Sequence, residues 1–169
     1  RSIAKKLPDN LMSLNFNRNV FYHAIWNDLT VKARGLFVDQ ITGKVKARSY
    51  NKFFNFGELG DEQEELDNLV YPVHISKKEN GFLGIVSYDE DNQKVIFATK
   101  STTQGDHTEL LKDVWNQCSL ENQSLVIELC KKYNASAVFE VCHPNDVHII
   151  DYNQQKKMFL LDFVPNQLH

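Results

Sequence analysis

The sequence has few cysteines, no long apolar run and little net charge, and each shortage excludes a class of protein. Its 3 cysteines, Cys118, Cys130 and Cys142, are odd in number and show no Cys-x-x-Cys spacing. The sequence therefore predicts neither a disulfide framework nor a zinc site, and we expect a reduced, cytoplasmic compartment. No apolar run is long enough to cross a bilayer and no signal-peptide pattern is visible, so no membrane partner is expected.

The charge balance limits how the chain can bind anions. A formal net charge of −3 argues against a protein that coats nucleic acid through a general positive field. An anionic substrate would have to be bound by a local cluster of cations. The sequence also lacks the Gly-x-x-x-x-Gly-Lys-Ser/Thr phosphate loop, so kinase activity of that type is not expected in this chain.

The pattern of apolar residues predicts strands joined mainly by hairpins, with helices inserted in blocks. An apolar content of 42% with 24% charged residues is typical of a globular domain, and 169 residues suffice for one real core. Strands are expected over residues 33–39, 44–49, 71–75, 82–88, 94–99, 137–142, 147–152 and 158–163, and residues 15–22 look partly extended. Helices are expected over residues 61–70, 108–117 and 120–133. This order predicts an α+β domain built on antiparallel sheet.

A pair of lysines, Lys77 and Lys78, stands between two of the predicted strands and is followed by Glu79-Asn80-Gly81. A lysine held in a short connection between buried strands can be forced toward its neutral form, and a neutral lysine is a nucleophile. The alternative is a basic, solvated turn. The short motif alone leaves both interpretations open.

Four elements occur in one order along the chain: Ala33-Arg34-Gly35, Lys52-Phe53-Phe54-Asn55, Lys78-Glu79-Asn80-Gly81 and Phe139-Glu140-Val141-Cys142-His143-Pro144. Together they resemble the nucleotidyltransferase domain of the ATP-dependent RNA ligases, in the branch typified by phage T4 RNA ligase 1. The resemblance covers roughly residues 15–152. It implies the antiparallel-sheet nucleotidyltransferase fold of that family, ATP and Mg²⁺ as cofactors, and RNA 5′-phosphate and 3′-hydroxyl ends as partners.

The resemblance also implies a role for each matching residue. Lys78 matches the catalytic lysine that becomes joined to AMP, and its spacing to Asn80 and Gly81 favours it over Lys77. The implied nucleotide-binding residues are Arg34, Lys52, Phe54, Asn80, Gly81, Lys100 and Glu140. Glu140 is also the implied metal ligand. Because it alternates with apolar neighbours on a predicted central strand, its carboxylate needs a partner.

A lysine nucleophile near neutral pH needs its pKa lowered by about 3 units from the free value. Nearby cations and burial both act in that direction. We therefore expect Arg34, Lys52 and Lys100 to converge on the Lys78 amine in one pocket that Glu140 also reaches.

The chain departs from the family pattern after Tyr152. The Glu-Gly strand and the Lys-x-Lys strand expected there are not visible, and Lys156-Lys157 has the wrong spacing. We therefore expect residues 1–169 to be the N-terminal and central part of an adenylyltransferase domain from a longer protein with further domains, or else a degenerate homologue. An incomplete fold would leave an open sheet edge beside residues 139–141 and would make adenylation by this chain alone slow.

The leading functional hypothesis is an ATP-dependent RNA ligase, in which a lysyl-AMP at Lys78 activates an RNA 5′-phosphate for joining to a 3′-hydroxyl in RNA repair. One alternative is another covalent nucleotidyltransferase, such as a DNA ligase or an mRNA-capping enzyme. Lys52-Phe53-Phe54-Asn55 argues against it, because this element belongs to the RNA ligase branch. The other alternative is a non-catalytic RNA-binding remnant of the fold.

Overall fold

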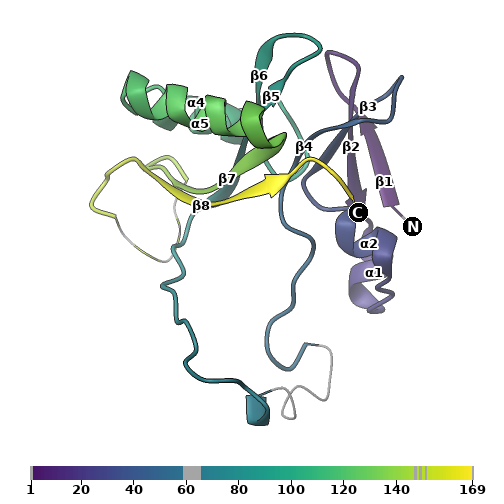
Figure 1. The fold of residues 1–169 in the computed structure, drawn as a ribbon. Helices are drawn as coiled ribbons and strands as arrows, with labels where there is room; N and C mark the ends of the chain where they lie inside the picture. The colour runs from purple at the N-terminus through teal and green to yellow at the C-terminus, as the bar shows by residue number, and fades with distance from the viewer. Residues whose placement is uncertain (1, 59–65, 147, 149, 151, 169) are drawn as a thin grey trace.

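Two four-stranded antiparallel sheets make up the framework of the chain (Figure 1). The structure is a computed structural model that describes residues 2–58, 66–146, 148, 150 and 152–168. Strand order is β1-β2-β3-β4 in the first sheet and β6-β5-β7-β8 in the second. The α+β architecture with antiparallel sheets that the sequence predicts is confirmed.

The first sheet contains the N-terminal strands. They are β1 (Ser2–Lys6), β2 (Leu11–Phe16), β3 (Leu36–Asp39) and β4 (Val45–Arg48). Two short helices, α1 (Arg18–Tyr22) and α2 (Asp28–Lys32), connect β2 to β3. The predicted extension of residues 15–22 is wrong beyond Phe16, because the Asn17 side chain accepts a hydrogen bond from Val20 N–H at 3.0 Å and starts a helix there.

The second sheet contains the strands that follow the lysine pair. They are β5 (Phe82–Asp89), β6 (Lys94–Ala98), β7 (Ala135–Cys142) and β8 (Lys157–Pro165). Helices α4 (Asp106–Trp115) and α5 (Leu120–Tyr133) cover one face of this sheet (Figure 1). The sequence predicted all six of these elements within a few residues.

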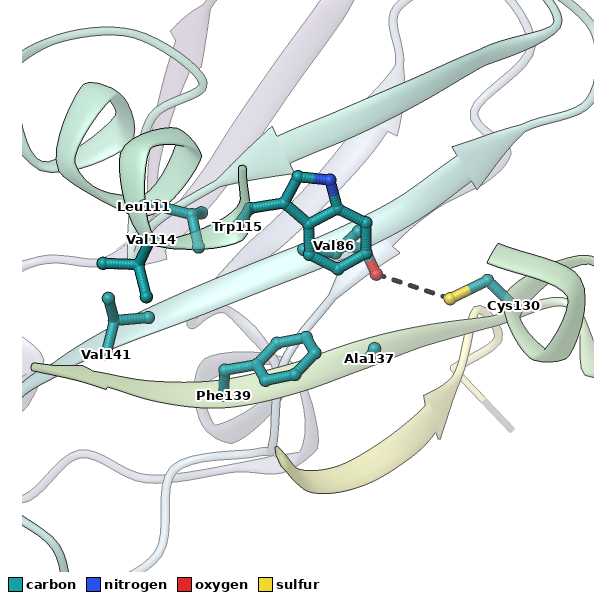
Figure 2. Packing of buried hydrophobic residues seen from close by; sticks show 8 residues of the cluster. All are labelled: Val86, Leu111, Val114, Trp115, Cys130, Ala137, Phe139 and Val141. Carbon is teal, nitrogen blue, oxygen red and sulfur yellow. Dashed lines mark hydrogen bonds between the residues drawn. The ribbon is translucent and has the colours of Figure 1, made fainter. Parts of the chain in front are cut away.

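Figure 2 shows the core between this sheet and its helices. Leu111, Val114 and Trp115 of α4 pack on Val86, Ala137, Phe139 and Val141 of the strands, and Cys130 joins them from α5. The Cys130 thiol also donates a hydrogen bond to the Val86 carbonyl at 3.6 Å. This packing holds β7, which carries Glu140, in a fixed place.

Two predicted strands differ from the structure, while one predicted helix is described only at its end, where residues 66–67 are helical. Residues 71–75 form no strand: they are exposed, and Pro72 has no N–H to give to a ladder. The described residues on either side of the gap, 49–58 and 66–81, run away from the sheets and back (Figure 1). The predicted helix over 61–70 lies mostly outside the described residues. The predicted strand over 147–152 does so in part, and its described residues 148, 150 and 152 are not in a strand.

The expected open sheet edge beside residues 139–141 is wrong. Strand β7 pairs with β5 on one side and with β8 on the other, so that Glu140 lies opposite both Leu83 and Phe159. The edge strand on this side of the sheet is β8 instead, which exposes Leu160 and Leu161. The strand before the C-terminus therefore fills the place where the sequence predicted a vacancy.

Apolar side chains from both sheets form a second core cluster. Its members are Leu7, Leu11, Phe37, Ala47, Ile85, Ile96 and Ala98. Residues Leu11, Phe37 and Ala47 come from the first sheet, and Ile85 and Ile96 come from the second. Burial of these side chains holds the two sheets against each other.

Buried hydrogen bonds fix the register between the sheets. Ser136 accepts from Arg48 N–H at 3.0 Å and donates to Asn166 at 2.7 Å, and Asn166 donates to Ser87 at 3.2 Å. Ser87 in turn donates to the Lys46 carbonyl at 2.7 Å. A satisfied polar network of this kind specifies one arrangement where apolar contacts alone would tolerate several.

A buried ion pair reinforces the same joint. The Lys46 ammonium lies 2.6 Å from Asp89 and 2.6 Å from the more exposed Asp91. Burial alone would raise the pKa of Asp89, but hydrogen bonds from Asn92 and Lys46 outweigh it and hold that pKa below its usual value. The stabilisation is therefore present above the pKa of an unfolded aspartate, ~3.9, and is lost as the pH falls through the lower folded value.

We predict that Asp89→Asn lowers the free energy of unfolding at neutral pH by about 1–3 kcal/mol, since it removes the buried charge that pairs with Lys46. Urea denaturation followed by circular dichroism measures the change. The difference from wild type should shrink as the pH falls below about 4, where the aspartate of the unfolded chain becomes protonated, and should be lost once the pH passes the lower folded-state pKa. Glu90→Gln, at the exposed neighbouring acid, is the matched control. An equal loss in both variants would contradict a specific ion pair.

Candidate functional site

The lysine pair lies at the end of the exposed segment that leads into β5. The Lys77 ammonium lies 2.9 Å from the Glu79 carboxylate, whereas the Lys78 ammonium donates to the Glu79 backbone carbonyl at 3.4 Å. The Glu79 carboxylate thus pairs with Lys77 and leaves the Lys78 ammonium with a backbone carbonyl. The choice of Lys78 as the nucleophile, made on its spacing to Gly81, stays a prediction.

Glu140 anchors the end of the lysine motif. Its carboxylate accepts a hydrogen bond from Gly81 N–H at 2.8 Å, and so ties the motif to the centre of the second sheet. A Cβ at Gly81 would lie 2.2 Å from the Val141 carbonyl oxygen, so only glycine permits this close approach. The half-buried Glu140 carboxylate thus finds its hydrogen-bond partner in the backbone of the lysine motif.

Tyr152 holds the two residues before Gly81. Its hydroxyl accepts from Asn80 N–H at 2.8 Å and donates to the Glu79 carboxylate at 2.7 Å. Burial, together with the hydrogen bond to Glu79, raises the pKa of Tyr152 to about 12 although the Asn80 N–H opposes the shift. Cys142 adds a contact from its thiol to the Asn80 carbonyl at 3.7 Å. Sequence reasoning missed Tyr152, which it placed only at the end of a predicted strand.

Arg34 lies close enough to Glu140 for their opposite charges to interact. Burial lowers the pKa of the Arg34 guanidinium, and the negative charge of Glu140 acts in the opposite direction. Its guanidinium carbon lies 5.8 Å from the centre of the Phe53 ring. The next residue, Gly35, donates from its N–H to the Lys100 carbonyl at 3.1 Å, which joins this turn to the end of β6.

Lys52 and Lys100 lie at the two ends of a row of aromatic rings. The Lys52 ammonium is 4.1 Å from the Phe54 ring centre, and the Lys100 ammonium is 5.9 Å from that of Phe16. The Trp26 ring lies between the rings of Phe54 and Phe16 and packs edge to face on both, with ring centres 5.1 Å and 5.0 Å apart. Such rings attract cations to their faces. Neither Trp26 nor Phe16 was singled out from the sequence.

The structure thus gathers the predicted site residues into two groups. One contains Glu140, Arg34, Asn80 and Gly81, and the other contains Lys52, Phe54 and Lys100. The hydrogen bond from Gly35 to Lys100 connects the groups. Lys52 is further held by Glu58, at 3.2 Å. The convergence of Arg34, Lys52 and Lys100 on the Lys78 amine stays a prediction.

Glu140 is the site's candidate metal ligand. Within the described residues, no cluster of three or more histidine, cysteine, aspartate or glutamate side chains could hold a metal ion. Magnesium, however, is commonly bound through one or two carboxylates together with substrate phosphates and waters. A single carboxylate at Glu140 fits magnesium in that form, with the substrate supplying the remaining ligands.

We predict that Tyr152→Phe increases the hydrogen-exchange rate of the Asn80 amide by about fivefold or more, because the amide loses a bond worth roughly 1 kcal/mol. Exchange followed by mass spectrometry of peptides spanning residues 76–84 measures this directly. Tyr133→Phe, at an exposed tyrosine of α5, is the control and should leave those peptides unchanged. Unaltered exchange in Tyr152→Phe would show that the hydroxyl does not hold the motif.

Comparison with protein families identifies the chain. The sequence pattern of the RNA ligase family matches residues 32–169, a span that contains all four elements singled out from the sequence. Comparison with curated proteins gives no match. Across the described residues, no helix is long and apolar enough to cross a membrane. Because the family match covers most of the chain, this protein belongs to the RNA ligase family typified by phage T4 RNA ligase 1.

Proposed function

We propose that the chain performs the nucleotidyl-transfer step of an ATP-dependent RNA ligase. The Lys78 amine attacks the α-phosphorus of ATP, forms a phosphoramidate bond to AMP, loses its proton and releases pyrophosphate. The AMP then passes to an RNA 5′-phosphate, and an RNA 3′-hydroxyl displaces it to seal the strand during repair. The observation that carries this proposal is the anchored motif: the three residues after Lys78 are tied to β7 and Tyr152 while Lys78 itself is exposed.

Anchoring gives the lysine a fixed point of attachment. Hydrogen bonds hold Glu79, Asn80 and Gly81 in place, so the Lys78 side chain begins from a defined backbone position. A nucleophile held near its target needs less ordering during the reaction, which lowers the barrier. The exposed side chain leaves room for a nucleotide to approach the amine.

The cations of the site would oppose the negative charge of the triphosphate. Arg34 is half-buried near Glu140, and Lys52 and Lys100 lie on the aromatic row. Phosphoryl transfer depends mainly on positioning and on charges aimed at the transferring group. In this proposal Phe54 contributes an aromatic surface against the nucleotide, and Asn80 and Gly81 shape the turn beside the α-phosphate.

Glu140 would hold magnesium through the carboxylate that also accepts from Gly81 N–H. When bound, the ion would neutralise charge on the phosphates during transfer. Glu140 would thus connect the nucleophile motif to the substrate phosphates. We propose on this basis that the two sheets and their motifs belong to one adenylyltransferase domain with the nucleotidyltransferase fold of the family.

We predict that Lys78→Ala abolishes covalent labelling by ATP that carries a radiolabel on its α-phosphate, since it removes the attacking amine. Lys77→Ala is the matched control and should keep much of the labelling, because that ammonium pairs with Glu79 instead. Denaturing gel electrophoresis of the protein after incubation with ATP and magnesium measures both. Equal loss in the two variants, or persistent label in Lys78→Ala, would contradict the assignment.

Two substitutions of Glu140 should separate its two proposed roles, which are magnesium binding and the hydrogen bond from Gly81 N–H. We predict that Glu140→Gln, which keeps an oxygen to accept from Gly81 N–H, raises the magnesium concentration needed for half-maximal labelling by about 10–100-fold. Glu140→Ala removes both roles and should also speed amide exchange at Gly81. Titration of labelling with magnesium, together with hydrogen exchange, distinguishes the two variants. Identical behaviour of Gln and Ala in both measurements would refute the double role.

The alternative of a non-catalytic RNA-binding remnant is favoured by one observation. The contact of the Lys78 ammonium is with a neighbouring carbonyl, while Lys52 is engaged by Glu58 and by aromatic rings. RNA binding without any covalent AMP would support this alternative, and a covalent adduct would exclude it.

A further inference from the structure

A pocket of about 320 Å³ lies between the N-terminal strands and the end of β6. This volume is at the lower end of the range for small-molecule sites, ~300–1,000 Å³. Its lining consists of Ile3, Lys5, Ser13, Asn15, Phe16, Lys100 and Ser101. Five of these seven residues are on β1 or β2, with Phe16 the last residue of β2. Residues 2–31 precede the span that matches the RNA ligase family, so the family pattern assigns no role to this wall of the pocket.

The register of β1 and β2 explains why these side chains meet. Lys5 pairs with Ser13, and Ile3 pairs with Asn15. Because side chains alternate between the faces of a strand, all four project from the same face of the sheet. Lys100 enters the pocket from the end of the second sheet, where its carbonyl is held by Gly35.

Two of the residues that line the pocket each carry a buried polar atom that has no hydrogen-bond partner among the described residues. These atoms are the Ser13 hydroxyl oxygen and the Asn15 side-chain oxygen, and Ser13 is fully buried. Leaving a buried hydroxyl unpaired is unfavourable, so a ligand that supplies the missing partners would be favoured. The Ser13 hydroxyl can donate, and the Asn15 oxygen accepts.

The charge of the pocket defines the donor and acceptor groups of that ligand. Its lining carries two ammonium groups, Lys5 and Lys100, in a chain of net charge −3. Phosphate oxygens accept from ammonium and hydroxyl groups, which matches Lys5, Lys100 and Ser13. A ribose hydroxyl both donates and accepts, and its donation would satisfy Asn15.

We propose that this pocket binds a ribose-phosphate group, with Lys5, Lys100 and Ser13 on the phosphate and Asn15 on a ribose hydroxyl. The choice of ligand rests on the proposed function, whose substrates, RNA and ATP, both contain this group. The pocket is thus a binding subsite of the ligase in which residues that precede the family match, Lys5, Ser13 and Asn15, join Lys100.

Binding measurements on the full chain test the proposal without any covalent step. The probes are a fluorescently labelled, 5′-phosphorylated single-stranded RNA oligonucleotide, followed by anisotropy, and ATP, followed by calorimetry. We expect Lys5→Gln to weaken binding of at least one probe by about fivefold or more. If that probe is RNA, we expect the dependence of log K on log salt to fall by about 0.7–1. Ser13→Ala should weaken binding of the same probe.

Lys6→Gln is the matched control. It makes the same charge change one residue away, on the opposite face of β1, where Lys6 pairs with Met12. Binding of both probes should stay within about twofold of wild type, since the Lys6 ammonium is exposed on the face away from the pocket and its charge is largely screened.

The two probes identify the source of the group. If the substitutions weaken binding of RNA alone, the pocket is assigned to the RNA strand. If they weaken binding of ATP alone, it is assigned to the nucleotide. The proposal is overturned if Lys5→Gln and Lys6→Gln act alike, if Ser13→Ala has no effect, or if neither probe binds the wild type. Covalent labelling of the wild-type chain by ATP separates the two hypotheses: absence of adenylation in the wild type, with binding that still depends on Lys5, would refute the proposed reaction and keep the pocket.

Discussion

The buried hydrogen bonds between the two sheets are the constraint on which the rest of the structure depends. Ser136 binds the backbone of Arg48, Ser87 binds the carbonyl of Lys46, and Asn166 connects the two serines. These contacts set how strand β4 lies against β5 and β7. The candidate site takes side chains from both sheets, so its geometry depends on this joint. A one-residue slip would turn the paired serines to the wrong face.

Much of the fold could be predicted because the second sheet and its helices carry strong local patterns. Apolar runs such as residues 82–88, and amphipathic stretches such as residues 120–133, indicate their own structure. The segment 71–75 misled because its composition is typical of a strand, while strand formation requires a neighbour to pair with. Strand β1 was missed for the converse reason: Ser2–Lys6 is polar, and it becomes a strand through its pairing with β2.

The candidate site divides in the same way. Lys78 and Glu140 could be singled out because their neighbours form recognisable motifs in the sequence, and their roles in catalysis and metal binding stay predictions. Tyr152 could not, since its role arises from a contact with Asn80 across 72 positions of the chain. The N-terminal wall of the ribose-phosphate pocket was equally hidden, because Ser13 gains significance only through its burial without a partner. Local sequence patterns thus indicate candidate reactive residues, whereas the residues that position them are found only from tertiary contacts.

Mapping the attachment site of AMP tests the central claim most directly. The full chain would be incubated with ATP and magnesium, digested, and examined by tandem mass spectrometry under conditions that preserve phosphoramidate bonds. The account predicts an added AMP on the peptide that contains Lys78, with fragment ions that place it on that side chain. An adduct on Lys77 or on another residue would contradict the assignment. RNA binding without any adduct would contradict the proposed reaction itself.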